Sequence, residues 1–171
     1  MTSRAFRFPS PLYAIVDPLG RPDVDPIELG ARMLAGGARL LQLRWKDGTA
    51  DDLVRAAREL ARRAETHGAW LLVDDRADVA LAAGAHGVHL GQDDLPVEAA
   101  RRILGDERVI GLSTHTLEQA SAADAAAVDY LGFGPIFATP TKATGYEPRG
   151  LAALSAVRAR VRRPIVAIGG I

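Results

Sequence analysis

The chain has 171 residues, a length that fits one domain with a sizeable core. Its 21 Lys and Arg residues balance its 21 Asp and Glu residues, so charge does not indicate binding to nucleic acid or to an anionic membrane. There is no cysteine, which excludes disulfides and thiolate chemistry, and no apolar run long enough to span a bilayer. We therefore expect a cytoplasmic, globular enzyme or binding domain.

Short apolar runs alternate with helical patterns along the whole chain. The predicted strands are Leu12–Asp17, Leu40–Arg44, Ala69–Asp74, Gly87–Leu90, Val109–Ser113, Tyr130–Gly134 and Pro164–Ile168, and helices are predicted over 26–35, 49–66, 77–83, 96–104, 116–127 and 151–160. Such alternation indicates βαβ units and a parallel sheet, and a spacing of about 25 residues between strands is typical of a (β/α)8 TIM-type barrel. We predict an α/β fold with a single barrel domain over residues 1–171.

The strand count falls short of a closed barrel. Seven strands are predicted where eight are expected, and barrels of this kind need at least about 200 residues. The chain is therefore either truncated at its C-terminal end or builds an open sheet. We favour truncation.

A cationic cluster follows the second predicted strand. Barrel sites are built at the carboxyl ends of the strands, and period-2 alternation places Gln42, Arg44 and Lys46 on one face. A solvated strand end would be the ordinary alternative. We favour a binding role, because an inward-facing Gln and Arg would be costly without partners.

Two pairs of aspartates follow the third and fourth strands. Asp75 and Asp94 are expected to face one another across the barrel mouth, while Asp74 or Asp93 is expected to cap the helix that follows it. Mg²⁺ prefers one or two carboxylates together with substrate phosphates. The pattern predicts one Mg²⁺ beside a phosphorylated ligand.

Further polar groups follow the later strands. Ser113 offers a hydroxyl, whereas His115 is interpreted as structural, and His86 and His89 lie on opposite faces and are poorly placed to share zinc. Thr139, Thr141 and Lys142 lie in a long loop, and hydroxyls beside an ammonium group indicate phosphate binding; an ordinary exposed loop is the alternative. Lys142 and Lys46 are the two lysines of a chain with 19 arginines. Gly170 would let backbone N–H groups approach a phosphate.

These segments resemble the thiamine-phosphate synthase (thiamine-phosphate pyrophosphorylase) family. The matching stretches are QLRWKD at 42–47, DDRADVALAAGAHGVHLGQDDLP at 74–96, GLSTHT at 111–116, DYLGFGPIFATPTK at 129–142 and VAIGGI at 166–171. The resemblance implies that a hydroxymethylpyrimidine diphosphate is joined to a hydroxyethylthiazole phosphate, or to its carboxylated form, with release of pyrophosphate. It also implies a dissociative, Mg²⁺-assisted mechanism.

The resemblance also implies roles for individual residues. Gln42, Arg44 and Lys46 would bind the pyrimidine diphosphate, and Asp75 and Asp94 would hold Mg²⁺. Ser113 and Lys142 would contact the diphosphate or the reacting region, and with Arg44 they form the expected catalytic set. Thr139, Thr141 and Gly170 would bind the thiazole phosphate.

Two departures from the family pattern leave alternatives open. Asp74 stands at a substrate-binding position where the family usually has Asn, and the segment of the eighth strand is absent. A thiazole tautomerase is the alternative within the superfamily, although it has His where Pro135 stands here. A non-catalytic protein that binds phosphorylated ligands is the alternative outside it. Assembly into a homo-oligomer stays open.

Overall fold

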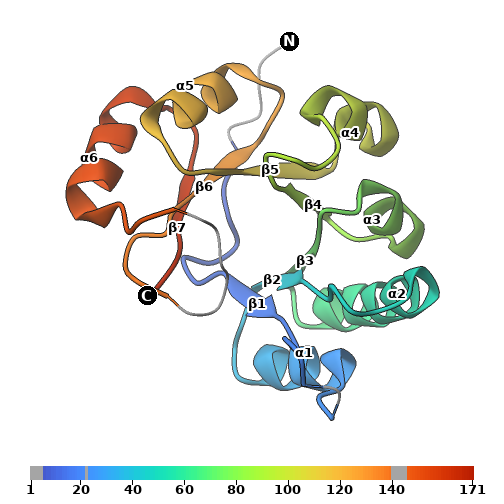
Figure 1. Cartoon of the computed structure of the whole chain (residues 1–171). Coiled ribbons are helices and arrows are strands. Elements are labelled where there is room, and N and C mark those ends of the chain that lie inside the picture. Colours follow the sequence, from blue (N-terminus) through green and yellow to red (C-terminus); the bar gives the residue numbers. More distant parts are fainter. Residues whose placement is uncertain (1–5, 22, 140–145) are drawn as a thin grey trace.

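A computed structural model describes residues 6–21, 23–139 and 146–171. Seven strands form one parallel sheet in the order β1-β2-β3-β4-β5-β6-β7, and Figure 1 shows the sheet curled with the helices on its outer side. The strands are β1 (Ala14–Val16), β2 (Leu40–Leu43), β3 (Trp70–Asp74), β4 (Gly87–Leu90), β5 (Val109–Thr114), β6 (Tyr130–Phe133) and β7 (Ile165–Ala167). The fold is an incomplete barrel of the TIM type, as the sequence predicts.

One helix follows each of the first six strands. They are α1 (Pro26–Ala35), α2 (Ala50–Thr66), α3 (Ala77–Ala83), α4 (Val97–Leu104), α5 (Leu117–Ala125) and α6 (Gly150–Arg160). Side-chain caps fix several starts: Asp25 accepts a hydrogen bond from the Ile27 amide, Thr49 from Asp52, and Thr116 from Gln119. No helix in the described parts of the chain combines the length and the apolar character needed to cross a membrane.

The expected aspartate caps of α3 and α4 are wrong. The N-cap residue is Arg76 in α3 and Pro96 in α4, and neither helix has a side-chain cap. Asp74 instead accepts hydrogen bonds and ion pairs from β2 and the loop after it, and Asp93 is exposed. In α4 the N-cap position itself is occupied by Pro96, whose side chain has no oxygen to accept from the first amides of the helix.

Alternation along the strands builds two apolar layers. Leu41, Leu43, Leu71 and Val73 face the helices in the larger cluster, while their neighbours Leu40 and Leu72 face the interior of the curled sheet. The interior layer also contains Val109 and Tyr130, with Phe6, Phe8, Tyr13, Trp70 and Val166 packed against it. This layer forms a floor beneath the carboxyl ends of the strands.

Glycine makes room for the largest side chain of this floor. A Cβ on Gly111 would lie 2.1 Å from Cζ of Tyr130, a ring with no solvent exposure. Gly132 likewise leaves space for His89, whose Cε1 would lie 3.1 Å from an added Cβ. The two glycines therefore allow an aromatic ring and an imidazole to fill the interior directly below the strand ends.

Candidate functional site

The second strand carries its polar residues to the sheet edge on one face. Gln42 is 5% exposed within β2, and its Nε2 donates to Oδ1 of Asp74 on β3 at 2.5 Å. Arg44 and Lys46 follow at the same period, and both form ion pairs with Asp74. The structure therefore brings the three predicted residues together around one carboxylate.

Arg44 lies between two carboxylates from neighbouring strands. Its Nη1 pairs with Oδ2 of Asp17, the residue directly after β1, and its Nε lies 3.5 Å from Oδ2 of Asp74. The side chains of Arg44 and Asp17 are each only 15% exposed. Asp17 did not emerge from the sequence as a site residue, because its contact depends on how β1 and β2 pair.

Lys46 extends a row of ion pairs in which carboxylates and cations alternate, in the order Asp17, Arg44, Asp74, Lys46 and Asp75. Its Nζ lies 3.4 Å from Oδ2 of Asp74 and pairs more closely with Oδ2 of Asp75. Asp75 adopts φ 61°, a value uncommon for residues other than glycine, and its amide donates to the His89 carbonyl at 2.8 Å. With Asp17, the cluster holds three carboxylates and two cations, so it carries one surplus negative charge.

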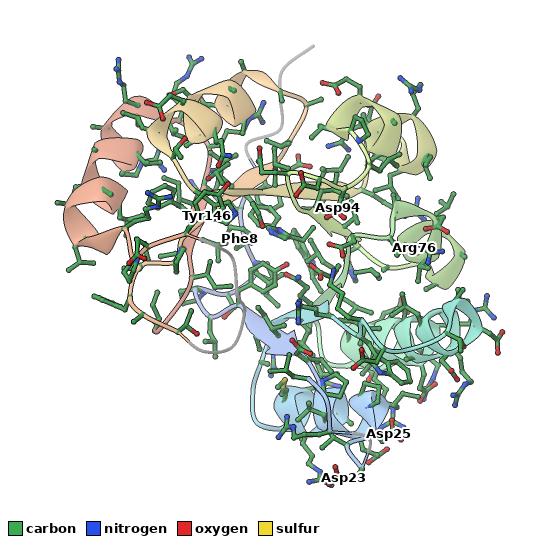
Figure 2. The ribbon with its side chains drawn as sticks, viewed as in Figure 1. Phe8, Asp23, Asp25, Arg76, Asp94 and Tyr146 are labelled. Carbon is green, nitrogen blue, oxygen red and sulfur yellow. The ribbon has the colours of Figure 1, made fainter. Side chains whose placement is uncertain are left out.

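Asp94 shares a pocket with Asp75, the last carboxylate of this cluster. The pocket has a volume of about 420 Å³ and lies between α3 and α4, where Arg76, Leu95 and Ile103 also line it. Asp94 Oδ2 accepts from the Gly91 amide at 2.6 Å, and a Cβ on Gly91 would lie 2.8 Å from that oxygen. Glycine thus allows the carboxylate to fold back over the end of β4. Figure 2 shows Asp94 on the inner side of the ring of helices, whereas Asp23 and Asp25 lie beside α1 on the periphery.

The two carboxylates of this pocket are of the ligand type that a hard divalent cation takes from proteins. No group of three or more His, Cys, Asp or Glu side chains suited to a metal occurs within the described ranges. Mg²⁺ does not need such a cage, because it is usually held by one or two carboxylates, substrate phosphates and water. Asp75 and Asp94 are therefore suitable protein ligands.

A hydrogen-bond chain runs beneath the charged cluster. Ser113 Oγ contacts His89 Nε2 at 2.9 Å, His89 Nδ1 contacts the Tyr130 hydroxyl at 2.7 Å, and that hydroxyl contacts the Tyr13 hydroxyl at 2.9 Å. Burial raises the pKa of both tyrosines, so both hydroxyls stay protonated. The chain has two possible proton orders: donation from Tyr13 through Tyr130 to Nδ1 leaves Nε2–H to donate to Ser113, and the reverse order has the Ser113 hydroxyl donate to Nε2.

His89 and the two tyrosines were missed as site residues by reasoning from the sequence. His89 was considered only as a zinc ligand with His86, which instead accepts from the Leu71 amide at 3.3 Å and stacks on Trp70. Strand alternation could have placed His89 on the inner face. The glycines opposite Tyr130 and His89 are a second signal, since they mark where large side chains enter the interior.

The end of β5 supports a different group of contacts. His115 Nδ1 contacts the Gly134 carbonyl at 2.6 Å, and its ring stacks on Tyr146 with centroids 4.2 Å apart. The guanidinium of Arg149 also lies over the ring of Tyr146, with its Cζ 5.1 Å from the ring centroid. These contacts agree with the structural role expected for His115, and they join both ends of the loop after β6.

The loops after β6 and β7 approach each other closely. The Phe137 amide donates to the Gly169 carbonyl at 2.8 Å, and a Cβ on Gly170 would lie 2.7 Å from the Ala138 carbonyl oxygen. Gly170 has φ 70°, so both its conformation and the close approach require glycine. Thr139 is half-buried beside this contact. Thr141 and Lys142 lie outside the described residues.

Comparisons with known proteins agree on one family. Residues 12–171 match the family described as thiamine monophosphate synthase. The chain is 49% identical over 160 residues to a thiamine-phosphate synthase from Anaeromyxobacter dehalogenans, covering 94% of this chain and 69% of that protein. It is 50% identical over 164 residues to one from Koribacter versatilis, covering 94% and 77%. A solved thiamine phosphate pyrophosphorylase from Pyrococcus furiosus superposes with a TM-score of 0.81 at 36% identity, covering 93% and 74%.

Proposed function

The chain belongs to the thiamine monophosphate synthase family, and on that premise we propose how its strand-end cluster makes thiamine phosphate. It is a transferase of thiamine biosynthesis. In the proposed reaction, a hydroxymethylpyrimidine diphosphate is joined to a hydroxyethylthiazole phosphate and pyrophosphate is released; when the carboxylated form is the acceptor, its carboxylate also leaves as CO2. The observation that carries the proposal is the convergence of Gln42, Arg44 and Lys46 on Asp74, with Lys46 also paired to Asp75.

We propose that the diphosphate binds to the two cations of this cluster. Arg44 offers a planar set of N–H donors that suits phosphate oxygens, whereas Lys46 acts as a compact point charge. The side chain of Lys46 is 47% exposed, so it is accessible to an incoming anion. Gln42 is held by Asp74, and this bond sets the orientation of its amide at the floor of the site.

Asp75 and Asp94 would hold the proposed Mg²⁺. When bound, the ion supplies positive charge that stabilises the pyrophosphate leaving group. The surplus negative charge of the cluster supports this assignment, because a trianionic diphosphate needs more positive charge than Arg44 and Lys46 provide alone.

The proposed chemistry is dissociative. The bond between the pyrimidinylmethyl carbon and the diphosphate oxygen breaks, and its electron pair leaves with pyrophosphate. The lone pair of the thiazole nitrogen then forms the new carbon–nitrogen bond. No protein base is consumed in these steps, so stabilisation of the leaving group by Arg44, Lys46, Ser113 and Lys142 carries the catalysis.

Ser113 is the group best supported to act close to the reacting atoms among the described residues. In the proposed site His89 carries its proton on Nε2 and donates it to the Ser113 hydroxyl oxygen, 2.9 Å away, so that the Ser113 proton can be donated toward the leaving diphosphate. The hydrogen-bond chain to Tyr130 and Tyr13 holds His89 in one orientation. His89 is therefore a positioning residue for Ser113.

The thiazole phosphate is proposed to bind at the contact between the loops after β6 and β7. Thr139 would supply a hydroxyl and Gly170 a backbone N–H group, with Thr141 from the adjacent part of the loop. The Gly169–Phe137 hydrogen bond supports the proposal, because it fixes the two loops against each other. We further propose that the enzyme works in the cytoplasm with these two phosphorylated substrates as its partners.

The test is release of pyrophosphate by the chain in the presence of each substrate alone, both substrates, and both with EDTA. We expect release only with both substrates and Mg²⁺. Binding of both substrates without release would support the phosphate-binding alternative, and conversion of the thiazole carboxylate alone would support a tautomerase. Either result would contradict the proposed activity.

A further inference from the structure

We propose that Asp17 is a positioning residue that holds the guanidinium of Arg44 in the orientation needed for the diphosphate. The inference rests on the proposed role of Arg44 as a diphosphate ligand. It adds the residue that follows β1 to a charged cluster that is otherwise built by residues at the ends of β2 and β3.

The Asp17 carboxylate is fixed at both oxygens. Oδ2 pairs with Arg44 Nη1, while Oδ1 accepts a hydrogen bond from the Leu19 amide at 3.0 Å. The turn behind it is also tied down, since Arg21 Nε donates to the Pro18 carbonyl at 3.1 Å. Pro18 restricts the backbone further because its φ is locked. The carboxylate is thus part of a small rigid turn at the end of β1.

Arg44 is oriented from two directions. Its backbone amide donates to the Val16 carbonyl at 2.9 Å, which places the residue directly beside Asp17. Asp17 then engages Nη1, and Asp74 lies 3.5 Å from Nε. A guanidinium has five N–H donors, so these contacts leave several for a phosphate. Loss of the Asp17 contact would free a long side chain to sample many rotamers.

Charge neutralisation does not explain this arrangement. Asp74 and Asp75 already balance Arg44 and Lys46, so Asp17 supplies the surplus negative charge that the diphosphate must overcome. A residue that served only as a counter-charge would oppose substrate binding. The geometric contribution, a short and mostly buried charge-assisted contact, is what Asp17 provides.

The test measures binding of inorganic pyrophosphate with Mg²⁺ by calorimetry to the wild type, Asp17→Asn and Asp17→Ser. An amide has one acceptor oxygen and cannot satisfy both Arg44 and the Leu19 amide, while Ser can keep the turn contact but cannot reach Arg44. We expect both variants to bind pyrophosphate about tenfold more weakly, which is about 1.4 kcal/mol. Unchanged or tighter binding would overturn the inference. If Asp17→Asn does not fold, the pyrophosphate affinity of Asp17→Ser tests the inference by itself.

Asp129→Asn is the matched control. Asp129 forms a similar partly buried pair with Arg101, at 2.9 Å, and its carboxylate also accepts from a backbone amide, that of Ile110. It precedes β6 and so lies at the opposite end of the sheet from the site. This variant should lose stability and keep the affinity for pyrophosphate.

A double-mutant cycle separates this inference from the proposed function. Asp17→Asn should have less than a twofold effect on pyrophosphate affinity when Arg44 is already Gln, because Asp17 acts through Arg44. Equal losses in both backgrounds would overturn the positioning role. If Arg44→Gln alone leaves the affinity unchanged, the proposed diphosphate site fails as well. If Arg44→Gln weakens binding and Asp17→Asn does not, the role of Asp17 alone fails.

Discussion

Gln42 Nε2 donates to Asp74 Oδ1 across neighbouring strands at 2.5 Å, in a part of the sheet where Gln42 is almost fully buried. The bond needs only an acceptor oxygen on residue 74, and an Asn could supply it. The carboxylate therefore contributes something further, which is its charge beside Arg44 and Lys46. Both ion pairs of Asp74 are longer than 3.3 Å, in contrast to the close contact of Arg44 with Asp17.

Asp74→Asn should tighten binding of the pyrimidine diphosphate. The substitution keeps an acceptor for Gln42 and removes one negative charge from a cluster with a surplus carboxylate. Removal of a charge about 4 Å from the anion is worth about 1 kcal/mol in a wet site, or roughly fivefold in KM. Steady-state kinetics with saturating thiazole phosphate measure the effect. A higher KM would mean that the charge of Asp74 itself serves the substrate.

Asp75→Asn and Asp94→Asn should each raise the Mg²⁺ concentration needed for half-maximal activity, by about tenfold or more. Each variant removes one of the two proposed carboxylate ligands, and an amide oxygen binds the ion more weakly. Asp93→Asn is the control, since Asp93 is exposed and is a neighbour of Asp94 in the chain. Equal Mg²⁺ titrations for all three variants would contradict the assignment of the metal ligands.

Tyr130→Phe should destabilise the protein by about 1–3 kcal/mol, because it leaves His89 Nδ1 and the Tyr13 hydroxyl without their buried partner. Tyr13→Phe removes only the terminal hydroxyl of the chain, so it should cost less, about 1 kcal/mol. Urea unfolding of both variants provides the comparison. A larger loss for Tyr13→Phe would show that the chain is not ordered as described.

Lys142→Arg should impair turnover although it keeps the charge, because a guanidinium is bulkier than the point charge proposed for the leaving group. Single-turnover formation of product measures this step. A rate equal to that of the wild type would remove the significance that we attach to the scarcity of lysine in this chain.

Stability should fall as the pH is lowered below about 6.5, with His86 as one contributor. Burial lowers the pKa of His86, so the unfolded state binds a proton more readily than the folded state does. The stability that His86 contributes is present above the unfolded pKa, near 6.5, and is lost as the pH falls toward the folded value. Urea midpoints at pH 7.5 and 5.5 should differ less in His86→Gln than in the wild type. An equal difference would exclude His86 as a source.

The sequence predicts the fold well because local patterns carry that information. The helices over 26–35 and 77–83 and the strand Gly87–Leu90 have the predicted bounds, since turn residues and apolar periodicity mark them directly. The convergence of Gln42, Arg44 and Lys46 also follows from alternation along one strand. Their roles in binding remain proposals.

The partners of these residues could not be predicted in the same way. Asp17 meets Arg44 because Val16 pairs with Leu43, and His89 meets Ser113 and Tyr130 through the pairing of β4 with β5 and β5 with β6. Register between strands is a tertiary property that no local pattern contains. Asp74 was assigned in part to helix capping for the same reason, because its ion pairs come from residues 44 and 46 beyond the neighbouring strand.

The most direct test of the proposed site is formation of thiamine phosphate, followed by mass spectrometry, from both substrates and Mg²⁺. The wild type is compared with an Arg44→Gln, Lys46→Gln variant whose folding is verified by circular dichroism. We expect product from the wild type and a loss of at least about a hundredfold in the variant, since two charge-assisted contacts to the leaving group are removed. Equal product from both proteins would contradict the central claim that these strand-end cations drive departure of pyrophosphate.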